Sequence, residues 1–218
     1  MAVKRPDGLA FRPYDRANIF CDDESRSFMS IFKTAGMSLG FVLSAFPANA
    51  EVVNASPDGF ELKLDRHSER LPKPQFDRIL RISEWWSGEH TYSGDASNLR
   101  ITTLAAGGQW RETWAAGDVE HGRVLSGSRA DGIWMVRFEA ALGPLQGMGV
   151  NGVLTIEVKP SGDTGSNVSF SYMVTGADFQ ELDQIAPVVD GVLEEQIDNL
   201  VSAGASPPKI GPAPLPTQ

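Results

Sequence analysis

Apolar residues recur at three- and four-residue steps in the segment 179–204, close to the end of the chain. The repeating positions are Leu182, Ile185, Ala186, Val189, Val192, Leu193, Gln196, Ile197 and Leu200. This spacing places side chains on one face of a helix. The pattern therefore predicts one long amphipathic helix over 179–204, with acidic residues on its other face.

Small and large side chains are distributed unevenly along this predicted helix. The part from Ala186 to Gly191 carries small residues, whereas the part from Leu193 to Val201 carries larger ones. Small side chains leave space and large ones fill it, so we expect any cavity at the Ala186–Gly191 half, beneath Trp110 and Trp134. The later half is expected to be solid core.

Seven segments before this helix alternate between apolar and polar residues, as strands do when one face is covered. They span 60–67, 99–104, 109–115, 119–128, 133–141, 149–159 and 166–175. Gly-containing turns separate most of them, which is typical of an antiparallel meander. Two short helices are predicted after the first strand, over 75–82 and at 83–87 with Ser83 as N-cap. The fold class is α+β, with a curved antiparallel sheet wrapped around the long C-terminal helix.

The alternation also assigns the side chains that face the helix. These are Trp110, Glu112, Trp114, Trp134, Val136, Phe138, Leu154, Ile156, Val158, Val168, Phe170, Tyr172 and Val174. The intervening positions are more polar, so one face of the sheet is expected to be covered and the other exposed to water. Large aromatics beneath a single narrow helix either enclose a ligand cavity or fill the gap, and both alternatives stay open at this stage.

Glu112 interrupts the apolar face between two tryptophans. A carboxylate in such a place must be paired, hydrogen-bonded or neutralised. One interpretation is a structural pair with an arginine or with backbone amides near Gly107 and Gly108. The other is a polar contact for a ligand, or a general acid or base, with Tyr172 as a second polar group.

The segment 29–50 has the parts of a secretory signal in their usual order: Lys33, an apolar run over 35–46, and the small-residue motif Ala48-Asn49-Ala50. The run is too short to span a bilayer. The alternative interpretation of this segment is a buried helix or strand of the folded domain. If it is a signal, cleavage after Ala50 would place the mature chain in the periplasm or outside the cell. Residues 1–28 lack periodicity and are interpreted as disordered or as an extension upstream of Met29, and the proline-rich tail 205–218 as disordered.

Composition excludes several classes of function. A formal charge of −9 disfavours a nucleic-acid surface. The single cysteine, Cys21, allows neither an internal disulfide nor a cysteine metal site, and His67, His90 and His121 match no ligand spacing. We see no Ser-His-Asp set and no phosphate-binding glycine loop, so no catalytic residue, metal or cofactor is expected. The exported chain is expected to be a monomer without a membrane span.

Several local motifs resemble the START-like superfamily, also called SRPBCC or polyketide cyclase/dehydrase-like. They are Ser83-Glu-Trp-Trp86, His90-Thr-Tyr-Ser-Gly-Asp95, Gly107-Gly-Gln-Trp110 with Glu112, Gly143-Pro-Leu-Gln146 and Val189-Asp-Gly-Val-Leu-Glu-Glu-Gln196. They look like a secreted bacterial branch. The resemblance implies a helix-grip domain over 57–204 that binds lipids or other apolar molecules beneath the helix, and it transfers no known active site.

The leading hypothesis is therefore the binding of a hydrophobic or aromatic small molecule, or a lipid, between the sheet and the C-terminal helix. The candidate ligand-binding residues are Trp86, Trp110, Glu112, Trp134, Phe138, Leu154, Tyr172, Val189 and Leu193. Two alternatives remain: a protein-interaction or envelope module with a filled core, and a cyclase- or hydrolase-type enzyme that uses Glu112.

Overall fold

A computed structural model describes residues 50–202 of the 218-residue chain. The predictions for 1–49 and for the tail 205–218 lie outside the described residues. Among the described residues, none of the helices combines the length and the apolar character that a membrane crossing requires.

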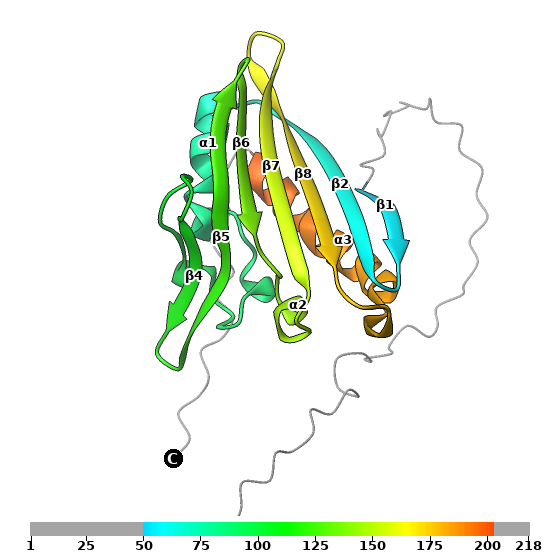
Figure 1. Ribbon diagram of the computed structural model, residues 1–218. Helices are drawn as coiled ribbons and strands as arrows, with labels where there is room; N and C mark the ends of the chain where they lie inside the picture. Colours follow the sequence, from blue (N-terminus) through cyan, green and yellow to red (C-terminus); the bar gives the residue numbers. More distant parts are fainter. Residues whose placement is uncertain (1–49, 203–218) are drawn as a thin grey trace, which may run out of the picture. The chain divides into compact units, whose positions relative to one another are not determined.

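One antiparallel sheet of eight strands makes up most of the described chain (Figure 1). The strands are β1 (Ala50–Ser56), β2 (Gly59–Ser68), β3 (Leu99–Ile101), β4 (Gln109–Trp114), β5 (Gly117–Ala130), β6 (Ile133–Glu139), β7 (Asn151–Ser161) and β8 (Gly165–Thr175). Their order across the sheet is β1-β2-β8-β7-β6-β5-β4-β3. The sheet is therefore a meander from β3 to β8, with the N-terminal hairpin β1–β2 added at the β8 edge.

The predicted count of seven strands is wrong because β1 was missed. Its sequence lacks regular alternation, and the pairing with β2 shifts register between Val52 and Asn54. A bulge of this kind adds a residue to one strand and so breaks the two-residue period that a sequence pattern relies on.

The short helices differ in detail from their predicted positions. Helix α1 (Pro72–Ile79) begins three residues earlier than expected, with proline in its first turn, and the 3₁₀ turn η1 (Ile82–Glu84) follows it. Ser83 lies inside that turn and is not its N-cap, a position that Arg81 occupies without a side-chain cap. A four-residue helix, α2 (Pro144–Gly147), connects β6 to β7 and was not predicted.

The long helix α3 (Leu182–Val201) lies against one face of the sheet, where it packs chiefly on β1 and β2 (Figure 1). It begins three residues later than predicted because Glu181 adopts a left-handed conformation, with φ of 51°, and breaks the helical path. Phe179, expected within the helix, precedes it and is 80% exposed.

Side chains from the β2–α1 segment bind the carbonyl groups at the end of α3. Arg78 Nε and Gln75 Nε2 both donate to the Leu200 carbonyl, each at 3.1 Å. Arg70 donates to the Val201 carbonyl at 3.1 Å and to the Ser202 carbonyl at 2.7 Å. The last carbonyls of a helix lack intrahelical partners, and positive charge there is favourable. These contacts fix the C-terminal end of α3 against the domain.

The predicted covered face is confirmed. Of the thirteen residues assigned to it, all are buried except Trp114 and Trp134, which are half-buried. The intervening residues on these strands are half-buried or exposed. The alternation of apolar residues thus identified correctly which side of the sheet packs against the rest of the domain.

Candidate functional site

Three of the predicted ligand-binding residues form a stack of aromatic rings. The Trp86 and Trp110 ring centroids are 4.8 Å apart, and those of Trp110 and Phe138 are 5.8 Å apart, both in edge-to-face arrangements. All three side chains are buried. This stack fills the space between β4, β6 and the segment that follows α1. The Nε1 hydrogen of Trp110 has no hydrogen-bond partner among the described residues, an arrangement that costs free energy in an apolar interior.

Glu112 is fully buried and is satisfied by three hydrogen bonds. Its carboxylate accepts from the backbone N–H groups of Tyr92 and Ser93 at 3.0 and 2.5 Å, and from Nε2 of His121 at 2.9 Å. Burial alone would raise the pKa of Glu112, but these hydrogen bonds outweigh it and lower the pKa. The partners of the Glu112 carboxylate are therefore the loop amides at 92–93 and the His121 imidazole. The sequence had suggested an arginine or the amides near Gly107 and Gly108, and that prediction is wrong. In this state Glu112 anchors the 92–93 loop.

Tyr172 is also fully buried, and it holds the end of β6 in place. Its hydroxyl donates to the Ala140 carbonyl at 2.9 Å and accepts from the Leu142 N–H at 3.2 Å. Burial raises the pKa of this phenol. Leu154 lies between Phe138 and Tyr172 in the strand register, so these three predicted residues are neighbours.

Trp134 belongs to a different environment from the ring stack. It lies at the other end of β6 from Phe138, where its ring centroid is 5.4 Å from that of Phe76 in α1. The guanidinium carbon of Arg129 lies 4.6 Å from the centre of the same ring. Trp134 therefore packs between α1 and a surface arginine.

Val189 and Leu193, the two predicted residues on α3, differ in burial. Leu193 is fully buried, as are Ile197 and Leu200 further along the helix. Val189 and Ile185, in the earlier half, are only partly buried. They share one side of α3 with Gln196, whose Oε1 accepts from the Ser87 N–H at 2.8 Å. Leu182 and Ala186, also in the earlier half, are fully buried, and Val201 near the end of the helix is only partly buried. The opening in the earlier half of α3 is therefore confined to Ile185 and Val189.

The segment after β6 provides further partly buried apolar residues near the start of α3. Ala141, Leu142 and Met148 pack against the core without being covered by it. Gln180 ties this segment to the approach of α3, because its Nε2 donates to the Met148 carbonyl at 2.6 Å. Partly exposed apolar side chains therefore lie both on the earlier half of α3 and on the β6–β7 connection.

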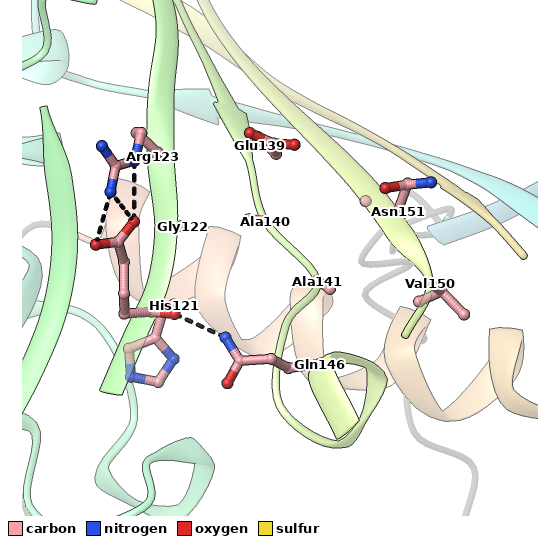
Figure 2. Close-up of a pocket in the computed structure, with 11 residues that line it drawn as sticks. His121, Gly122, Arg123, Glu139, Ala140, Ala141, Gln146, Val150 and Asn151 are labelled. Atoms are coloured by element: carbon pink, nitrogen blue, oxygen red, sulfur yellow. Dashed lines mark hydrogen bonds and ion pairs between the residues drawn. The ribbon is translucent and has the colours of Figure 1, made fainter. Parts of the chain in front are cut away.

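A pocket of about 340 Å³ lies beside the part of β5 that no longer pairs with β6 (Figure 2). Its lining residues are Glu120, His121, Gly122, Arg123, Glu139, Ala140, Ala141, Gln146, Val150, Asn151 and Gly152. None of these belongs to the predicted ligand-binding set. The β5–β6 register begins at Arg123 and Glu139, and the chain turns away beyond that pair through α2. The pocket is the gap that this divergence leaves.

His121 is the residue of this pocket that the sequence reasoning missed. It is 6% exposed, and it occupies the bulge in β5 between Glu120 and Gly122, opposite Trp110 and Arg111. The bulge turns His121 towards Glu112 although regular alternation would not predict that direction. A signal existed in the sequence: Glu112 and His121 flank one tight hairpin, which brings polar residues on its two strands together.

The described residues contain no group of three or more His, Cys, Asp and Glu side chains arranged to hold a metal ion. A His–Glu pair beside a polar pocket can accept hydrogen bonds or take up a proton. The aromatic face can take up apolar atoms only where side chains leave it open. The two regions therefore offer different chemistry.

Neither the protein-family profiles nor the curated protein sequences give a match to this chain. Among solved structures, it is similar to a hypothetical protein from Helicobacter pylori at 12% identity, over 78% of this chain and 97% of the other, with a TM-score of 0.46. Norcoclaurine synthase from Thalictrum flavum is 12% identical over 66% of this chain and 92% of the other, with a TM-score of 0.45. The human StarD13 lipid transfer and protein localization domain is 12% identical over 68% of this chain and 79% of the other, with a TM-score of 0.43. At these values the likeness supports no conclusion about ligand or activity.

Proposed function

We propose that this chain binds a small apolar molecule or a lipid between the earlier half of α3 and the β6–β7 connection. The observation that carries the proposal is the difference in burial along α3. Ile185 and Val189 remain partly exposed on the side of the helix that faces the domain, whereas Leu193, Ile197 and Leu200 are fully buried. Apolar side chains left open beside one another favour an apolar ligand, because burying them releases water.

A further feature supports this location. Ala141, Leu142 and Met148 supply a second apolar wall, and Gln180 holds that wall against the start of α3. The arrangement is similar to a helix-grip fold, in which a sheet and a C-terminal helix enclose a binding site.

A bulky substitution on α3 tests the proposal. In Val189→Trp the new ring would occupy the open side of the helix, and we expect affinity for the fluorescent probe 1-N-phenylnaphthylamine to fall by roughly tenfold. The control is Val188→Trp, because Val188 is the adjacent residue and is 49% exposed. It should bind the probe as the unchanged protein does.

The proposal fails if protein extracted with organic solvent and refolded shows no saturable rise in probe fluorescence. It also fails if both tryptophan variants lose binding equally. Either outcome would favour the alternative of an interaction module with a filled core, which the stacked rings of Trp86, Trp110 and Phe138 would then explain.

We further propose that the chain acts after export, in the periplasm or outside the cell. Cleavage after Ala50 would remove only the first residue of β1, so the sheet would remain complete. N-terminal sequencing of protein expressed from the whole coding sequence in a bacterium tests this. A mature chain that begins at Glu51 in the exported fraction is expected, and an intact chain retained in the cytosol would contradict the proposal.

A further inference from the structure

The pocket between β5 and β7 is lined in part by hydrogen-bond acceptors that have no partner within residues 50–202. Glu112 is ionised, and an ionised carboxylate only accepts, so Nε2 of His121 carries the hydrogen of their shared bond. Burial lowers the pKa of His121 although Glu112 acts in the opposite direction, and the imidazole is therefore neutral at neutral pH. Its Nδ1 is then a hydrogen-bond acceptor.

Gln146 adds a second acceptor. Its Nε2 donates to the Glu120 carbonyl at 2.7 Å, which directs the side chain from α2 towards β5 (Figure 2). This bond uses one of the two amide hydrogens, and Oε1 has no hydrogen-bond partner among the described residues. In Figure 2 one ring nitrogen of His121 lies on the side of Gln146.

The charges around the pocket are unequal. Arg123 binds the carboxylate of Glu120 through Nε and NH2, at 2.8 to 3.1 Å, so these two charges neutralise one another. Glu139, across the pocket, has no ion-pair partner among residues 50–202. One negative charge is therefore left over, together with the acceptors of His121 and Gln146.

Two glycines form part of the pocket lining. A Cβ atom on Gly122 would lie 2.7 Å from the Cβ of Ala140, and one on Gly152 would lie 2.8 Å from the Tyr172 hydroxyl. Only glycine allows the strands to approach so closely at these two positions. The wall is therefore backbone at these two positions, whereas Glu120, Arg123, Glu139 and Gln146 contribute side chains elsewhere.

We propose that this pocket binds a small organic cation of the ammonium type, at a site that adjoins the apolar one at Ala141. An ammonium group has several hydrogen-bond donors, no acceptor and one positive charge, which matches the unpaired acceptors and the excess negative charge. An anion would meet the carboxylate of Glu139 and an arginine already occupied by Glu120. The volume of about 340 Å³ is within the range of sites for small molecules.

The test is an NMR titration of the whole chain at pH 7.5 with three probes of equal length: n-butylammonium, n-butanol and butyrate. The imidazole signals of His67, His90 and His121 report separately, since these are the three histidines of the chain. We expect n-butylammonium to shift the His121 signal in a saturable way and to leave those of His67 and His90 in place. Butanol and butyrate should produce little change at His121.

Variants sharpen the result. Glu139→Gln removes the unpaired charge at an exposed position, and we expect roughly threefold weaker binding of n-butylammonium. Glu157→Gln removes the same charge from β7 outside the pocket, where Glu157 pairs with Lys159, and should leave binding unchanged. The proposal is overturned if n-butylammonium gives no saturable shift at His121, if butyrate binds as well, or if both variants weaken binding equally.

Discussion

The two halves of α3 meet the rest of the domain in different ways. The later half buries Leu193, Ile197 and Leu200 completely, and Arg70, Gln75 and Arg78 bind its final carbonyl groups. The earlier half starts at a left-handed residue without a side-chain cap and leaves Ile185 and Val189 partly exposed. The same helix thus anchors the fold at one end and leaves Ile185 and Val189 partly open at the other, although Leu182 and Ala186 there are fully buried. The later turns of α3 therefore stabilise the fold, and the earlier turns carry the proposed binding surface.

The largest expected effect comes from making the same substitution in each half. Ile197→Ala removes a fully buried side chain and should lower the free energy of unfolding by about 3 kcal/mol. Ile185→Ala should cost about 1 kcal/mol, because its side chain is already partly in water. Urea denaturation of both variants measures the difference, and equal losses would show that the two halves are packed alike.

The second effect concerns the bonds at the end of α3. Arg78→Met removes the donor to the Asn199 carbonyl and one of the two donors to the Leu200 carbonyl, so we expect the free energy of unfolding to fall by about 2 kcal/mol. Arg81→Met is the matched control, because both arginines pair with Glu84 but Arg81 is half exposed. The free energy of unfolding of Arg81→Met should fall by no more than about 0.5 kcal/mol. Thermal unfolding compares the two, and similar melting temperatures would argue against the anchoring role.

The smallest effect separates two aspartates on α3. Burial raises the pKa of Asp190, and the nearby carboxylate of Glu194 raises it further, whereas Arg66 lowers it. One carboxylate oxygen of Asp190 also lacks a hydrogen bond among the described residues. A raised carboxyl pKa means that this group favours the fold when protonated, and that this contribution is lost as the pH rises through the folded-state value. Asp190→Asn should therefore stabilise the protein at pH 7, by less than about 1 kcal/mol, and lose this advantage in acid.

Asp198 provides the contrast for that experiment. It accepts from Arg66 Nε at 2.5 Å, so Asp198→Asn should weaken the fold slightly at pH 7. Denaturation curves at several pH values follow both variants. A loss of stability in Asp190→Asn at pH 7 would contradict the raised pKa of Asp190.

Much of this contrast could be predicted from the sequence. Three- and four-residue spacing identified α3, and two-residue alternation identified the covered face of β4 and β6 to β8, because both patterns follow directly from backbone geometry. The uneven side-chain sizes along α3 predicted a cavity at the Ala186–Gly191 half, and this stays a prediction. Whether Trp86, Trp110 and Phe138 would enclose a cavity or stack on one another could not be predicted, since this depends on how a loop of irregular structure folds over them.

Features that depend on irregular backbone were missed. A register shift hides β1, and a bulge turns His121 towards Glu112. The polar pocket arises because β6 ends at Glu139 while β5 continues, and the paired lengths of two strands cannot be derived from the alternation of either one. Such sites become visible only when strands are placed side by side.

Photo-crosslinking would show where an apolar molecule binds, because a light-activated probe labels the residues that it contacts. A diazirine-bearing fatty acid would be bound to the full chain, activated by light and located by peptide mass spectrometry. We expect labels on the earlier half of α3 around Ile185 and Val189 and on the segment 141–148, with none on the later half. Labels confined to exposed apolar residues of the sheet such as Leu125 and Met173 would contradict it.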